Sequence, residues 1–73
     1  MDVEGVILEI VKDRFMSITQ IHKELLIRGF TLNHYATYRH VIKMEKIGEV
    51  FSVIGENGKP GVKPPLFKAL PEL

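Results

Sequence analysis

The chain has 73 residues, and its 10 lysines and arginines against 9 aspartates and glutamates give a formal net charge of +1 at neutral pH. Hydrophobic residues make up 45% of the sequence and charged residues 26%, which is typical of a folded globular domain and excludes a disordered chain. The chain contains no cysteine, which excludes a disulfide scaffold, a cysteine zinc site and a thiol nucleophile.

The sequence has no features of a membrane or exported protein. No apolar run approaches the ~20 residues of a membrane-spanning helix. The first ten residues carry acidic side chains among the apolar ones and no basic leader, so they do not form a signal peptide pattern. We expect an intracellular protein, cytoplasmic or nucleoid-associated, that forms a single domain over residues 1–73.

The first predicted helix covers about residues 3–13. Asp2 is a suitable N-cap, and Lys12 and Arg14 would place positive charge near the C-terminal end, where it interacts favourably with the helix dipole. Gly5 weakens the first turn. The apolar residues that recur at helical spacing are Val3, Val6, Ile7, Ile10 and Val11.

The second predicted helix covers about residues 18–28. Ser17 and Gln20 have the spacing of a capping box, with Ser17 as the N-cap. Gly29 suits the left-handed position that follows a helix end, and Phe30 can pack back on the last turn.

The third predicted helix covers about residues 34–47, with Asn33 as its N-cap. Gly48 ends this helix. Its buried stripe is predicted to consist of Thr37, Val41, Met44 and Gly48, which lie close together on a helical wheel. Its opposite face carries Arg39, Lys43 and Lys46.

Two strands are predicted after the helices, over residues 50–54 and 65–70. The first segment is β-branched and aromatic, and the Gly, Pro and Asn content of residues 55–64 predicts a loop between the two. The short turn between the second and third helices gives a helix-turn-helix, followed by a β-hairpin. The predicted fold class is therefore α+β.

Residues 36–50 resemble the recognition-helix pattern of the winged-helix family of DNA-binding domains. In that pattern a small or hydroxyl residue, a buried aliphatic residue, Tyr and Arg precede a helix that closes on Leu-Glu-x-x-Gly; here the closing residues are Met44-Glu45-Lys46-Ile47-Gly48. Residues 61–68 resemble the return strand of the family's wing. The resemblance implies a three-helix winged helix-turn-helix with a C-terminal two-stranded β-hairpin wing.

In this family the third helix usually enters the DNA major groove, and the wing reaches the backbone or the minor groove. Two departures are Ala36, at a position where a hydroxyl residue is common, and Thr37, at a usually aliphatic core position. The DNA-binding candidates that the resemblance and the charge pattern provide are Tyr35, Tyr38, Arg39, Lys43 and Lys46 on the helix, and Lys59 and Lys63 in the wing.

The charge is unevenly distributed along the chain. Residues 1–32 hold four basic and five acidic residues, whereas residues 33–68 hold six basic and three acidic residues. Few cations per protomer predict a modest affinity for double-stranded DNA and favour a homodimer on a two-fold site. Apolar residues that fall off the buried stripes would supply a protein interface, and these are Leu8, Ile27, Ile42 and Ile47.

Catalytic and metal-binding functions are not expected. His22, His34 and His40 lack a metal-ligand spacing, and Ser17 is explained as a cap. The chain offers no room for a ligand pocket of the usual ~300–1,000 Å³, so neither a cofactor nor a small-molecule ligand is expected. The favoured function is that of a small DNA-binding transcriptional regulator. The alternative is a winged-helix adaptor that binds proteins and not DNA.

Overall fold

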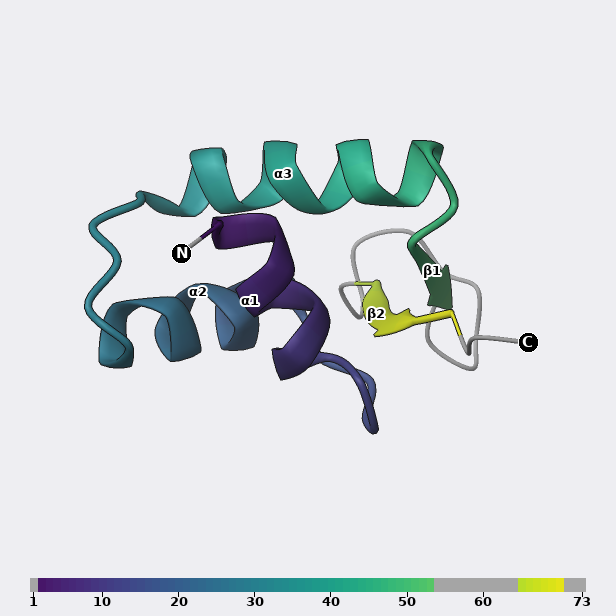
Figure 1. The fold of residues 1–73 in the computed structure, drawn as a ribbon, viewed down its shortest axis with the longest axis horizontal. Helices are drawn as coiled ribbons and strands as arrows, with labels where there is room; N and C mark the ends of the chain where they lie inside the picture. Colours follow the sequence, from purple (N-terminus) through teal and green to yellow (C-terminus); the bar gives the residue numbers. More distant parts are fainter. Residues whose placement is uncertain (1, 54–64, 71–73) are drawn as a thin grey trace.

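The computed structural model describes residues 2–53 and 65–70. Across these residues three helices precede a two-stranded antiparallel sheet, and the elements are α1 (Val3–Ile10), α2 (Ile18–Ile27), α3 (His34–Lys46), β1 (Val50–Val53) and β2 (Leu66–Ala69). The three helices pack on one another, and the hairpin lies beside the C-terminal end of α3 (Figure 1). The predicted α+β class is confirmed, and the arrangement is consistent with a winged helix.

Helix α1 is shorter than predicted and ends at Ile10 instead of residue 13. Val11 leaves the helix although it remains buried, because its carbonyl oxygen accepts a hydrogen bond of 3.0 Å from the backbone N–H of Ala69 in β2. Lys12 and Arg14 therefore lie beyond the helix, and the prediction that they would complement its dipole is wrong. A tertiary contact with the sheet ends this helix earlier than its apolar periodicity indicates.

Helices α2 and α3 begin and end as the capping residues predict, to within one residue. Ser17 accepts a hydrogen bond from the N–H of Gln20, whose side chain accepts one in return from the N–H of Ser17. Gly29 and Gly48 both have a positive φ, of 93° and 87°. Each follows its helix in a Schellman motif, in which the next residue donates its N–H back into the last turn, to Leu25 and Met44 respectively.

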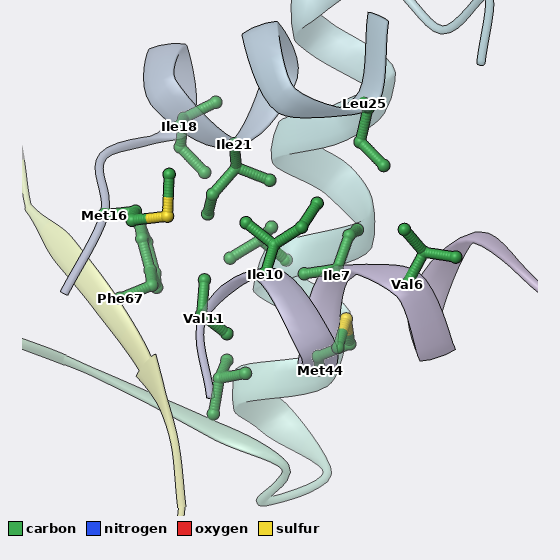
Figure 2. Close-up of a cluster of buried hydrophobic side chains, with 12 residues drawn as sticks. Val6, Ile7, Ile10, Val11, Met16, Ile18, Ile21, Leu25, Met44 and Phe67 are labelled. Carbon is green, nitrogen blue, oxygen red and sulfur yellow. The ribbon is translucent and has the colours of Figure 1, made fainter. Parts of the chain in front are cut away.

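The hydrophobic core joins all three helices to the hairpin (Figure 2). The fully buried part includes Ile7 from α1, Ile21 and Leu25 from α2, and Met44 from α3. Of the stripe predicted on α3, Thr37, Val41 and Met44 are buried. Gly48 is exposed, so the prediction that it belongs to the buried stripe is wrong. The reason is that the chain leaves the helical path at the Schellman motif, before it reaches Gly48.

One core position of α3 is occupied by a polar residue whose hydroxyl group has a hydrogen-bond partner. Thr37 is completely buried, and its hydroxyl donates a hydrogen bond of 3.1 Å to the backbone carbonyl of Asn33, the N-cap residue of the same helix. A buried hydroxyl is costly only when it lacks a partner. The threonine is therefore compatible with a position that is usually aliphatic.

The hairpin pairs Val50 with Ala69 at one end and Val53 with Leu66 at the other. The second strand is shorter than predicted by one residue at each end, whereas Ile54, the last residue of the first predicted strand, and the predicted loop at 55–64 lie outside the described residues. Sequence analysis did not predict that Met16, before α2, joins the far edge of β2. Met16 and Phe67 exchange two backbone hydrogen bonds, of 2.9 and 2.8 Å, which tie the start of α2 to the hairpin.

Among residues 2–53 and 65–70, no helix has the length and apolar character needed to cross a membrane.

Candidate nucleic-acid interface

The outward side of α3 forms one continuous surface with an open hollow of about 770 Å³. All five DNA-binding candidates that were predicted on this helix line it. We call it the α3 surface, and the residues lining it are Glu4, Tyr35, Ala36, Tyr38, Arg39, His40, Ile42, Lys43 and Lys46. The structure thus brings the helix candidates together. The two wing candidates, Lys59 and Lys63, lie outside the described residues.

Two aromatic side chains of the α3 surface are open to solvent. Tyr35 is 64% exposed and Tyr38 is 44% exposed, so neither is a core residue. The guanidinium of Arg39 lies 5.9 Å from the centre of the Tyr35 ring, one helical turn away. This distance permits a cation–π interaction, which restrains the arginine while leaving its donors available.

An acidic residue from another helix interrupts this basic surface. The carboxylate of Glu4, in the first turn of α1, accepts a hydrogen bond of 2.9 Å from Nδ1 of His40. The same oxygen lies 3.5 Å from the ammonium of Lys43. The Glu4 side chain is only 18% exposed, whereas that of Lys43 is 66% exposed. The carboxylate is therefore held against α3, and the lysine remains largely in solvent.

The surroundings of Glu4 favour its charged form. The hydrogen bond from His40 lowers the pKa of the Glu4 carboxyl below its ordinary value of 4.5, and the positive charge of Lys43 acts in the same direction. Partial burial opposes this effect without overcoming it. The α3 surface consequently carries a negative charge among its three cations, Arg39, Lys43 and Lys46, at neutral pH.

The histidines have structural partners. His22, at the edge of the core, donates from Nε2 to the carbonyl of Leu32 at 2.7 Å. Its ring meets that of His34 edge to face, with 5.9 Å between centroids. His40 contacts Glu4. In the part of the chain that the structure describes, no three residues with His, Asp or Glu side chains gather in a way that could hold a metal ion.

A second open hollow, of about 740 Å³, lies between α1 and the outer side of the hairpin. Its apolar lining comes from Leu8, Phe51, Ala69 and Leu70, and its charged residues are Glu9, Lys12, Asp13 and Lys68. Both hollows are open to solvent, so neither is the enclosed pocket that usually buries a small-molecule ligand, and the expectation that no such ligand binds stays a prediction.

The four apolar residues predicted to form an interface do not lie on one surface. Leu8 and Ile42 are partly buried against the core. Ile27 is 69% exposed at the end of α2, and Ile47 is 60% exposed at the end of α3. These two helix ends lie on opposite sides of the molecule (Figure 1). A common interface built from all four residues is therefore not present in one protomer.

Sequence reasoning missed the contact of Glu4 with His40 and Lys43. Glu4 and His40 are 36 positions apart in the chain, and no sequence motif connects them. Helical periodicity places Glu4 beside the buried stripe of α1, but it does not reveal which helix lies next to it. Only the packing of α1 on α3 brings the carboxylate to the basic face.

Comparisons with known proteins give no family assignment: no protein-family model, no curated protein and no solved structure matches this chain.

Proposed function

We propose that the protein binds double-stranded DNA through the α3 surface and acts as a small transcriptional regulator. The observation that carries this proposal is the convergence of Tyr35, Tyr38, Arg39, Lys43 and Lys46 on one exposed helix face. That helix is the second of a helix-turn-helix pair, and such a helix fits the major groove of B-DNA.

The chemistry of the surface divides into two roles. Lys43 and Lys46 neutralise phosphates and release counterions, which gives affinity without sequence preference. Arg39 presents planar donors that can bond O6 and N7 of guanine together, and Tyr35 limits its motion. Lys59 and Lys63 extend the contacts in the proposed wing. Because one protomer offers few cations, we propose that the protein binds a two-fold site as a homodimer.

Duplex binding by substituted proteins tests this proposal. Alanine at Lys43 and at Lys46 weakens binding to all duplexes, because each substitution removes a phosphate contact. Lys23→Ala is the matched control, since Lys23 is an exposed lysine on α2 and lies outside the α3 surface. Equal losses for Lys23→Ala and Lys43→Ala would reject the α3 surface as the binding face.

A protein-binding adaptor is the second candidate function. The apolar part of the hollow between α1 and the hairpin favours it, because the large apolar side chains of Leu8, Phe51 and Leu70 are partly or fully exposed there. Salt dependence separates the two functions. Binding to phosphates weakens steeply with added salt, whereas binding through apolar contacts does not.

A further inference from the structure

We propose that Glu4 is a built-in competitor of DNA phosphate: its carboxylate occupies Lys43 and His40 and thereby lowers the affinity of the α3 surface for any duplex. This inference rests on the proposed function. It assigns to a residue of α1 a role in setting the strength of nucleic-acid binding by α3.

The geometry is that of a counter-charge placed within the binding face. Oε2 of Glu4 lies 2.9 Å from Nδ1 of His40 and 3.5 Å from Nζ of Lys43. A phosphate oxygen that approached either group would meet the same donors that Glu4 already uses. The Lys43 side chain is largely exposed, so its ammonium can turn toward a phosphate. The phosphate must then compete with the carboxylate of Glu4 for the positive charge of Lys43.

Glu4 itself cannot move aside easily. It is in the first turn of α1, which the side chain of Asp2 caps and which the buried residues Val6 and Ile7 hold against the core. Its side chain is mostly covered. The negative charge of Glu4 would therefore stay close to the phosphates of a bound duplex, and the two like charges would repel each other.

A carboxylate in this position has a second conceivable role, in which it accepts a hydrogen bond from the N4 amino group of cytosine in the major groove. The two roles predict opposite effects. A competitor lowers affinity for every sequence, so its removal strengthens binding. A base-reading acceptor contributes to affinity for its preferred sequence, so its removal weakens binding there. The first role is favoured here because both neighbouring donors already engage the carboxylate.

The test compares Glu4→Gln with wild type on a random-sequence duplex, by fluorescence anisotropy at about 50 and 200 mM salt. Glu4→Gln removes the charge and keeps an oxygen that can accept from His40. We expect tighter binding of Glu4→Gln by several-fold at the lower salt concentration. If one additional phosphate contact is gained, this advantage shrinks about threefold at the higher concentration, because each contact contributes about 0.9 to the logarithmic salt slope.

Glu9→Gln is the matched control, because it changes the net charge by the same amount as Glu4→Gln. Glu9 is exposed on the same helix but lines the hollow between α1 and the hairpin. We expect it to change affinity by less than about twofold, as a distant charge is screened. A second variant, Glu4→Met, removes the charge with a side chain of similar length and should reproduce the gain. In a Lys43→Gln background, Glu4→Gln should lose most of its effect.

Each outcome decides the question. The competitor role would be supported if only the Glu4 variants, and not Glu9→Gln, bound the duplex more tightly than wild type. It would also be supported if Glu4→Gln bound the duplex while wild type did not bind detectably. Equal gains for Glu4→Gln and Glu9→Gln would overturn it in favour of net charge alone. Weaker binding by both Glu4 variants in a folded state, confirmed by thermal melting, would also overturn it. If wild type and all variants fail to bind at tens of micromolar protein, the proposed DNA-binding function itself fails.

Discussion

The carboxylate of Glu4 in α1 accepts a hydrogen bond from Nδ1 of His40 in α3, and this contact links the first helix to the proposed DNA-binding face. Only 2.9 Å separates the two atoms, and Lys43 lies next to the same carboxylate. The contact has two consequences. It stabilises the packing of α1 on α3, and it places a negative charge on a surface that is otherwise basic.

The first prediction concerns the dependence of stability on pH. The folded-state pKa of Glu4 is lowered, so the folded protein binds fewer protons than the unfolded chain at acidic pH, and stability rises with pH. The stabilisation by Glu4 is complete above its ordinary pKa of 4.5 and is lost as the pH falls through the lowered value. Urea unfolding of wild type and Glu4→Gln measures this contribution.

We expect wild type to be more stable than Glu4→Gln at about pH 7, and this difference to disappear at about pH 2. The pH change affects many other groups in both proteins equally, so the difference between the two proteins isolates Glu4. A difference that stayed constant over this range would show that the variant acts through packing and not through the charge of the carboxylate.

The second prediction compares two exposed glycines, one in a left-handed conformation after α3 and one inside α1. Gly48 has a φ of 87°, a region that alanine reaches at a cost of about 1–2 kcal/mol, and a methyl group there would meet nothing within 4 Å. Gly48→Ala should therefore lower the free energy of unfolding by about that amount. Denaturant unfolding measures the change, whose physical cause is the strain of a Cβ atom at the left-handed position of the Schellman motif.

Gly5→Ala is the control for Gly48→Ala. Gly5 lies inside α1, and a Cβ atom there also has open space around it. Alanine is the better helix former by roughly 1 kcal/mol, so this variant should be more stable than wild type. The same chemical change thus has opposite effects at the two positions. Destabilisation of similar size by both variants would contradict the structural explanation.

The third prediction separates base reading from phosphate contact on the α3 surface. Arg39→Ala should alter which sequences are preferred, because a bidentate arginine contributes about 1–3 kcal/mol of discrimination for guanine. Lys46→Ala should weaken binding to all sequences to a similar extent and reduce the salt slope by about one. Selection from a random duplex pool, followed by titration of the enriched and unenriched sequences, measures both effects. Equal loss on every sequence for Arg39→Ala would refute its reading role.

The fourth prediction concerns the oligomeric state. Homodimerisation would double the number of cations presented to a two-fold DNA site. We expect sedimentation equilibrium to show a dimer at high micromolar protein concentration, and a larger dimer fraction in the presence of duplex DNA. A monomer under both conditions would contradict the proposed dimer, while leaving DNA binding by single protomers to be measured separately.

Much of the fold could be predicted from local signals. The residues that cap α2 and α3 act over three or four positions, so Ser17, Asn33, Gly29 and Gly48 identify helix boundaries directly. The end of α1 could not be predicted in this way. It depends on a hydrogen bond between Val11 and Ala69, which are far apart in the sequence and meet only after the hairpin has formed.

The same distinction applies to the site. Helical spacing was sufficient to group Arg39, Lys43 and Lys46 on one face, and the structure places them there. The position of Glu4 on that face depends on how α1 crosses α3, which no pattern within either helix specifies. The four predicted interface residues do not share one surface for a related reason: Leu8 and Ile42 are off the buried stripes of their own helices but are partly buried by packing between elements.

The most direct test of DNA binding is a fluorescence-anisotropy titration of wild-type protein with random duplex DNA at about 50 and 200 mM salt. If Lys43 and Lys46 each neutralise one phosphate, affinity should fall at least about 12-fold across this range, and further if Lys59 and Lys63 add contacts. Such a fall would support binding through phosphate contacts. Failure to bind at tens of micromolar protein, or binding that is insensitive to salt, would contradict the proposed function and favour the adaptor.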